Sequence, residues 1–127
     1  MPENYFFLDS DKGIIREELL DEKARSLAQS FGGEQRNALS HTQLRRFFND
    51  LRNLEKRAER SSFEKMKPRI KMVKSKVAYA SKDKIPQSFE KFMNDSISAI
   101  ENEKDFEAFM LHFEAVLGFS KKYLNKK

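Results

Sequence analysis

The chain has 127 residues, of which 25 are Lys or Arg and 20 are Asp or Glu, so its formal net charge is +5. This length predicts one domain over residues 1–127, in which the first 13 residues lead into the folded part. The lack of Cys excludes disulfide scaffolds, thiol catalysis and zinc sites built on Cys, and it favours a reducing compartment. No stretch approaches the roughly 20 apolar residues of a membrane span, so we expect a cytoplasmic protein that does not enter a membrane.

The sequence predicts an all-α fold of about five helices. It has only four Gly and three Pro, and no run of alternating polar and apolar residues indicates a strand. Apolar residues spaced three and four apart predict a first helix from Ile15 to Phe31. Gly32 and Gly33 then end this helix.

A capping box of Ser40 and Gln43 opens the second helix, whose apolar stripe covers residues 44–58. A third helix is expected to start near Met66. This start would leave Pro68 in the first turn, where its missing N–H group costs nothing.

Pro86 opens a fourth helix, with apolar residues as far as Ile100, and a fifth helix is predicted from Phe106 to about Tyr123. The fifth helix is apolar around more than one face and should be mostly buried. The twelve Phe residues either fill this core or form part of a subunit interface. In the second case, Pro68 would allow helices to exchange between the two chains of a homodimer.

Positive charge is concentrated in the middle of the chain. Residues 45–84 contain 14 basic and 5 acidic side chains, a local net charge of +9, whereas residues 1–44 carry −3 and residues 85–127 carry −1. The basic side chains of the second helix occupy a sector of about 140°, opposite its apolar stripe. A segregated cationic face of this kind predicts binding to the phosphates of a nucleic acid. The alternative is a solvated basic face that has no partner.

Tyr79 and Met72 project away from the apolar stripe of the third helix, toward Lys65 and Lys76. An aromatic ring among cations can stack on a base of single-stranded RNA or DNA. The alternative is that Tyr79 packs on a neighbouring helix or subunit.

The residues that could support catalysis do not form a site. Ser40 and His41 are adjacent, but the nearest downstream carboxylate, Asp50, lies about half a turn around the helix from His41. His112 lies in an apolar helix, where a satisfied or boundary histidine is expected rather than a ligand. The acidic residues between positions 17 and 22 are favoured by the dipole of a helix start and need no metal. We therefore expect neither an enzyme nor a cofactor.

Three short blocks occur in a characteristic order along residues 39–123. They are Thr42-Gln43-Leu44-Arg45 at the opening of a helix, Ala78-Tyr79-Ala80 near the end of the basic segment, and Asp105-Phe106 at the opening of the final helix. In their order and spacing, the chain resembles the small helical subunit of the type III-A CRISPR effector, the Csm complex. The small subunit of the type III-B complex and a helical protein–protein adaptor are the alternatives.

The resemblance implies a noncatalytic RNA-binding subunit of an antiviral defence complex. Such subunits are stacked in more than one copy beside other Csm subunits, and they help to hold the guide RNA and its single-stranded target transcript. The basic positions near the matching blocks, together with the cationic sector of the second helix, give the candidate RNA-binding residues Arg45, Arg46, Arg52, Lys56, Lys74, Lys76 and Lys82. Tyr79 is the candidate for base stacking.

Overall fold

The computed structural model of the chain describes residues 4–32, 39–81 and 85–124. This part of the chain contains two short strands, one 3-10 helix and five α-helices, so the prediction of an all-α fold with five helices is confirmed. The α-helices are α1 (Glu22–Gly32), α2 (His41–Arg60), α3 (Phe63–Ala80), α4 (Gln87–Ala99) and α5 (Glu103–Tyr123). None of the helices in the described ranges combines the length and the apolar character needed to cross a membrane.

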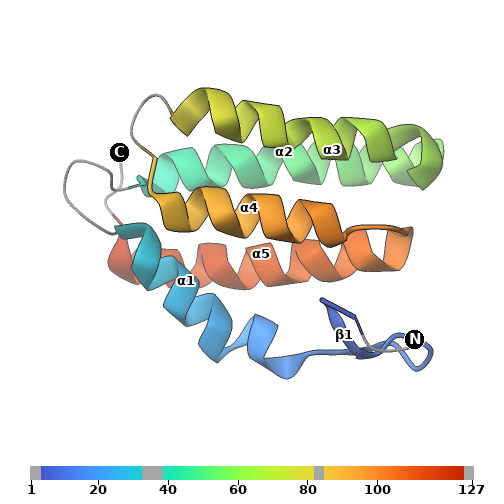
Figure 1. The fold of residues 1–127 in the computed structure, drawn as a ribbon, viewed down its shortest axis with the longest axis horizontal. Coiled ribbons are helices and arrows are strands. Elements are labelled where there is room, and N and C mark those ends of the chain that lie inside the picture. The colour runs from blue at the N-terminus through green and yellow to red at the C-terminus, as the bar shows by residue number, and fades with distance from the viewer. Residues whose placement is uncertain (1–3, 33–38, 82–84, 125–127) are drawn as a thin grey trace.

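The helices α2, α3, α4 and α5 lie along the long axis of the molecule, and α1 runs obliquely across the bundle (Figure 1). Around the bundle, α2 packs on α3 and α5, α3 packs on α4, and α1 packs on both α5 and α4. The consecutive helices α2 and α3 therefore form a helical hairpin whose outer surface is not covered by α1, α4 or α5.

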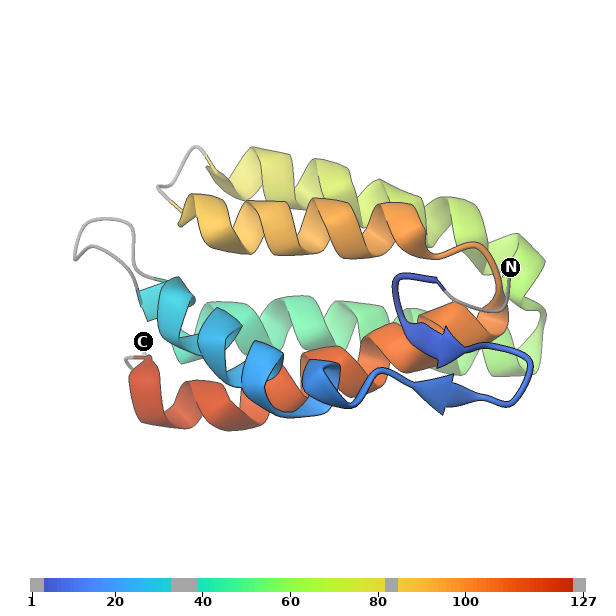
Figure 2. The same cartoon turned by 60° about the horizontal axis from the view of Figure 1, so that its bottom comes forward.

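The N-terminal segment forms a small β-hairpin, which the sequence did not predict. Strand β1 (Phe7–Asp9) pairs antiparallel with β2 (Ile14–Ile15), and Gly13 takes the left-handed conformation, with φ of 69°, in the connecting turn. In Figure 2 this hairpin lies beside the bundle near the start of α5. The expectation of no strand was wrong because strands of three and two residues are too short to show an alternating pattern.

The first predicted helix is interrupted. Instead of one helix from Ile15, a 3-10 helix covers Glu17–Leu20 and α1 starts only at Glu22. The carbonyl oxygen of Leu19, which a continuous α-helix would use within its own backbone, accepts a hydrogen bond from His112 Nδ1 on α5. A long-range contact therefore replaces the local hydrogen bond, and the periodicity of the apolar residues does not reveal the break.

The helix α3 begins three residues before the predicted start near Met66. The hydroxyl oxygen of Ser62 accepts a hydrogen bond from the Lys65 backbone N–H at 3.2 Å, and Phe63 is already buried. Pro68 consequently lies in the second turn rather than the first, so the predicted position of Pro68 was wrong. A serine cap combined with an early buried aromatic residue outweighs the cost of a proline inside the helix.

The helix α5 also begins earlier than predicted, at Glu103. The side chain of Asn102 caps it by accepting the backbone N–H of Asp105 at 2.9 Å. The buried carboxylate of Asp105 accepts the backbone N–H of Glu101 at 3.0 Å and the side-chain amide of Asn4 at 3.2 Å. Asp105 thus joins the start of α5 to the N-terminal segment.

The predicted openings of α2 and α4 are confirmed. In α2 both hydrogen bonds of the capping box are present, because the Ser40 hydroxyl accepts the Gln43 backbone N–H at 3.1 Å and the Gln43 side chain accepts the Ser40 backbone N–H at 2.9 Å. Pro86 directly precedes α4. α1 ends at Gly32 as predicted, while Gly33 lies outside the described residues.

The twelve Phe residues all lie in the described ranges, where each is buried or half-buried against the core. Phe92 lies at the centre of an aromatic cluster and has the rings of Phe109 and Phe113 within 5.9 Å. Of the two uses foreseen for the Phe residues, the structure favours filling of the core. Fully buried aromatic rings stabilise the packing of α1, α4 and α5 against one another.

Candidate nucleic-acid interface

The cations predicted on the second helix lie on the exposed side of α2. Arg45, Arg46, Arg52 and Lys56 are all exposed, while Leu44 and Leu51 face the core. At about 100° per residue, Arg45, Arg52 and Lys56 cluster along one line of α2, and Arg46 is displaced from them toward α3. The structure therefore brings three of these four side chains onto one ridge.

One charge on this ridge is partly neutralised. Arg52 Nη1 lies 2.8 Å from Glu55 Oε1 on the next turn of α2. Burial, the largest effect, raises the pKa of Glu55 above its usual value, and the positive charge of Arg52 offsets this rise only in part. Because Arg52 itself is half-exposed, its guanidinium keeps donors free for a phosphate while it is held in place by Glu55.

The lysines of α3 divide between two sides of the helix, and one set supports α4. Lys71 Nζ donates to the carbonyl oxygens of Ile97 at 2.6 Å and Ile100 at 2.7 Å, and Lys67 Nζ donates to that of Glu101 at 3.1 Å. Lys74 Nζ donates to the Ser98 hydroxyl. The ammonium groups of Lys67 and Lys71 thus bind carbonyls at and just after the C-terminus of α4, where the negative end of its dipole lies.

This arrangement changes the environment of Lys71 and of Lys74. Burial, followed by the positive charges of Lys74 and Lys67, lowers the pKa of Lys71. Lys74 was predicted to contact RNA, but it lies on the α4 side of α3 and its ammonium group contacts Ser98. The structure thus separates Lys74 from the cations that face α2.

The second set of α3 cations faces outward and toward α2. It consists of Lys65, Arg69 and Lys76, and each of these side chains is exposed. Lys76 Nζ lies 3.8 Å from Asp50 Oδ2 across the α2–α3 boundary. Within the described ranges, no ion pair engages Arg69 or the facing Arg57 of α2.

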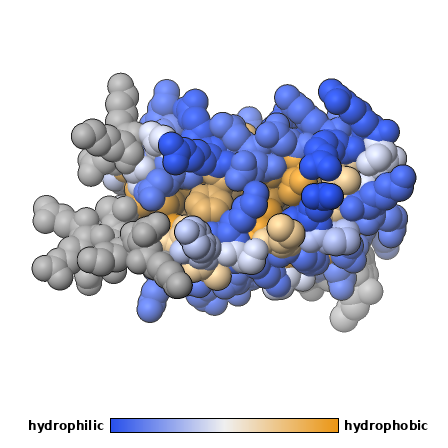
Figure 3. Space-filling view, turned by 90° about the horizontal axis from the view of Figure 1, so that it is seen from above, coloured by the Kyte–Doolittle hydropathy of each residue, from blue (hydrophilic) through white to orange (hydrophobic). Residues whose placement is uncertain are grey.

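A groove with a volume of about 220 Å³ separates the exposed edges of α2 and α3, and we call it the α2–α3 groove. Figure 3, which looks down onto the α3 side, shows hydrophilic side chains bordering a narrow apolar strip. The α2 residues of the groove are Asp50, Asn53, Leu54 and Arg57. Its α3 residues are Arg69, Met72, Val73 and Lys76.

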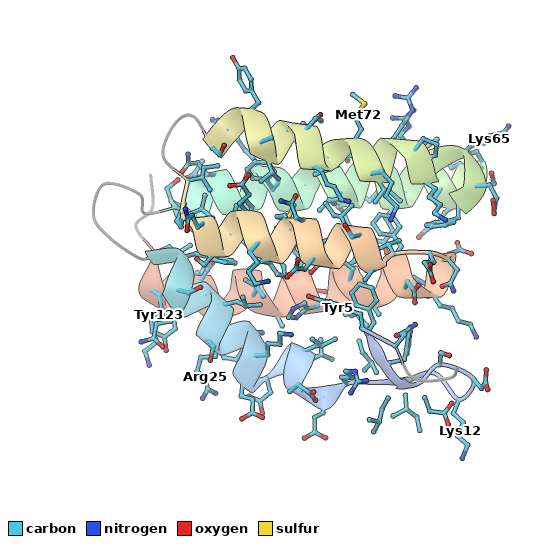
Figure 4. The ribbon with its side chains drawn as sticks, in the orientation of Figure 1. Tyr5, Lys12, Arg25, Lys65, Met72 and Tyr123 are labelled. Carbon is cyan, nitrogen blue, oxygen red and sulfur yellow. The ribbon has the colours of Figure 1, made fainter. Side chains whose placement is uncertain are left out.

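Two apolar side chains of α3 stand out of the bundle next to these cations, as the sequence predicted. Met72 is 58% exposed and Tyr79 is 76% exposed. In Figure 4 the side chain of Met72 points away from the bundle. The ring of Tyr79 is therefore accessible for stacking, and Met72 forms the outer edge of the α2–α3 groove.

Sequence reasoning did not select Arg57, Arg69 and Asn53 as site residues. Arg57 and Arg69 belong to the basic segment, but nothing local distinguishes them from other exposed cations. Both line one groove because α2 and α3 pack antiparallel, and sequence spacing alone does not give the register between two helices. Lys82, which was predicted to contact RNA, lies outside the described residues.

The residues that suggested catalysis have structural roles. The Ser40 hydroxyl accepts the Gln43 backbone N–H and so belongs to the cap of α2. His41 is buried, and burial, followed by the charge of Arg45, lowers its pKa. In the ranges that the structure covers, no group of three or more His, Asp or Glu side chains could hold a metal ion.

Comparison with known families gives one match over most of the chain. The family model described as Csm2 Type III-A matches residues 16–126, a range that includes both α2 and α3. Neither a curated protein nor a solved structure matches the chain. The match agrees with the type III-A resemblance and not with the type III-B alternative.

Proposed function

Since this chain belongs to the Csm2 Type III-A family, the small subunit of the type III-A Csm complex, we propose that it is a noncatalytic RNA-binding subunit. In this proposal it holds the guide RNA and its target transcript within the complex, in the cytoplasm, during antiviral defence. The observation that carries the proposal is the exposed cationic surface that α2 and the outward side of α3 share.

The proposed mechanism does not depend on RNA sequence. Arg45, Arg46, Arg52 and Lys56 on α2 and Lys76 on α3 contact phosphates, and each contact releases condensed counterions. Pairing between guide and target supplies the sequence information, so the protein needs only to follow the backbone. Tyr79 contributes a stacking surface for an unpaired base.

The direct test reverses two charges on the α2 ridge. We expect Arg45→Glu/Arg52→Glu to weaken the binding of single-stranded RNA at least tenfold at low salt, measured by fluorescence anisotropy. The slope of log K against log salt should become shallower by about 1.4, because two phosphate contacts are lost. Far-UV circular dichroism should stay unchanged, since both side chains are exposed.

A matched control carries the same change of charge elsewhere. Lys12 lies in the β-hairpin turn and Lys91 on the exposed side of α4. The variant Lys12→Glu/Lys91→Glu should bind RNA clearly better than the ridge variant does. Equal RNA affinity of the two variants would show that the net charge of the protein alone governs RNA binding. Undiminished RNA binding by the ridge variant would favour a protein–protein adaptor.

The place of the protein in the complex is tested in the native host. A tagged chain should copurify with repeat-derived guide RNA and with the other subunits of the Csm complex. Recovery of the subunits without RNA after replacement of Arg45 and Arg52 would separate assembly from RNA binding.

Self-association is a further part of the proposal. The Phe residues fill the core of a single chain, so side-by-side copies would meet through other surfaces, whereas an exchange of helices at Pro68 would bury the same residues between two chains. Light scattering over a range of protein concentrations tests this proposal. A molecular mass that stays monomeric throughout would refute self-association of the isolated chain.

A further inference from the structure

The α2–α3 groove has more features than phosphate binding requires. Cations stand at both of its ends: Arg57 and Arg69 line one end, and Lys76 lies at the other, where its ammonium nitrogen is 3.8 Å from Asp50 Oδ2. In each helix the two end positions are seven residues apart, which corresponds to about 10.5 Å along the axis. The groove is therefore a short segment bounded by cations and not a continuous basic track.

Between its ends, the groove is amphipathic. Leu54 and Val73 are apolar lining residues, and the exposed thioether of Met72 forms one edge. The amide of Asn53 lies among them and makes no hydrogen bond to another described side chain. A surface that followed phosphates alone would have no use for an apolar centre with a polar amide beside it.

This combination matches the chemistry of an unpaired nucleotide. The face of a base is apolar and polarisable, and the flexible thioether of a methionine packs readily against aromatic rings. An Asn amide can both donate to and accept from the edge of a base, and a carboxylate such as that of Asp50 accepts from an exocyclic amino group. The flanking phosphates would then meet Arg57 and Arg69 at one end and Lys76 at the other.

We propose that the α2–α3 groove binds one unpaired nucleotide of the RNA, with its base against Met72 and its edge toward Asn53. This inference rests on the proposed RNA-binding function and adds the form of RNA that the groove selects. In a duplex the bases are stacked and paired, so only unpaired RNA can place a base in the groove. An acidic peptide fits less well, because an acidic side chain offers neither an apolar face to Met72 nor a donor to the carboxylate of Asp50.

The methyl group of Met72 reports on the groove directly. The full chain, labelled with ¹³C at its methionine methyl groups, is titrated with single-stranded RNA of about eight nucleotides. We expect the Met72 signal to shift through the ring current of a base, while the buried Met66, Met93 and Met110 serve as internal references. An abasic oligomer of the same length keeps the phosphates and should cause no such shift.

Affinity measurements on matched variants supply the second readout. We expect Asn53→Ala/Met72→Ala to weaken the binding of single-stranded RNA about fivefold, with the salt dependence of binding unchanged. Its binding of blunt duplex RNA should equal that of the unaltered chain. Asn49→Ala removes a neighbouring exposed amide that does not line the groove, and it should leave both affinities unchanged.

Each outcome separates this inference from the proposed function. An equal Met72 shift with the abasic oligomer, or equal weakening of duplex binding by the double variant, would overturn base recognition and leave phosphate binding intact. If RNA shifts backbone NMR signals elsewhere in the protein and the Met72 methyl signal does not move, the groove is not the site at which the nucleotide binds. A Met72 shift with a polyglutamate peptide and none with RNA would assign the groove to an acidic protein segment, and no RNA binding anywhere would refute both proposals.

Discussion

The side chain of His112 joins α5 to the 3-10 helix by donating a hydrogen bond from Nδ1 to the carbonyl oxygen of Leu19. A carbonyl can only accept, so this bond places a hydrogen on Nδ1. The imidazole is fully buried, and its Nε2 has no partner among the described residues. Burial lowers the pKa of His112 to about 4, which keeps the ring neutral at physiological pH.

This pKa makes stability depend on pH. Between about pH 6.5 and pH 4 the unfolded chain binds a proton on His112 and the folded chain does not, so the free energy of unfolding falls as pH decreases. The expected total contribution is about 3 kcal/mol. Urea unfolding at a series of pH values measures it.

The variant His112→Asn isolates this contribution, because its amide can still donate toward Leu19 while it does not titrate. We expect the curve of stability against pH to be flatter for this variant between pH 6.5 and 4. Parallel curves for the two proteins would contradict the assignment. His41, whose pKa is also lowered by burial, is present in both proteins and cancels in the comparison.

At the scale of secondary-structure elements, α3 has different partners on its two sides. Toward α4, Lys67, Lys71 and Lys74 hold the last turn of the neighbouring helix. Toward α2, Arg69 and Lys76 line the groove. The high lysine content of α3 therefore serves both the stability of the bundle and the proposed interface with RNA.

Replacing Lys71 tests this division. We expect Lys71→Met to lower the free energy of unfolding by about 1–2 kcal/mol, because carbonyls of Ile97 and Ile100 lose their charged donor. RNA affinity should change by less than twofold. Lys65→Met, on the outward side of α3, is the control and should leave stability nearly unchanged.

If the two variants unfold at the same urea concentration, the contacts between Lys71 and α4 do not stabilise the bundle. If Lys71→Met binds RNA much more weakly at unchanged stability, the α4 side of α3 belongs to the interface instead. Both results are read from one urea titration and one anisotropy titration for each variant.

For the whole molecule, the segregation of charge is the dominant electrostatic feature. Residues 45–84 carry a local net charge of +9 and lie mainly in α2 and α3, which pack side by side (Figure 1). Repulsion among these exposed cations opposes folding, and it is screened by salt because the Debye length is about 10 Å at 0.1 M.

We therefore expect the thermal midpoint of the isolated chain to rise by a few degrees when sodium chloride is increased from about 0.02 M to 0.3 M. The variant Arg45→Glu/Arg52→Glu, in which the repulsion is already reduced, should show a smaller rise. Circular dichroism melts of both proteins measure the effect. A midpoint that falls with salt would mean that exposed ion pairs outweigh the repulsion.

Much of the fold was predictable because it depends on local sequence. The period of apolar residues places Leu44, Leu51 and Ala58 on one side of α2 and the cations on the other, whatever α2 packs against. The capping box of Ser40 and Gln43 involves residues three apart, so its geometry is contained in the helix start itself. The exposure of Met72 and Tyr79 followed from the same helical period.

Other features were decided only by tertiary structure. The break before α1 depends on His112, 93 residues along the chain from Leu19, and the division of the α3 lysines depends on where α4 ends. Arg57 and Arg69 line one groove because of the register in which two helices pack. The sequence by itself determined that five helices form and which side of α2 is cationic, since neighbouring residues settle both. Which cations face one another was set by contacts between distant segments, because packing of the core fixes the rotation and the register of each helix.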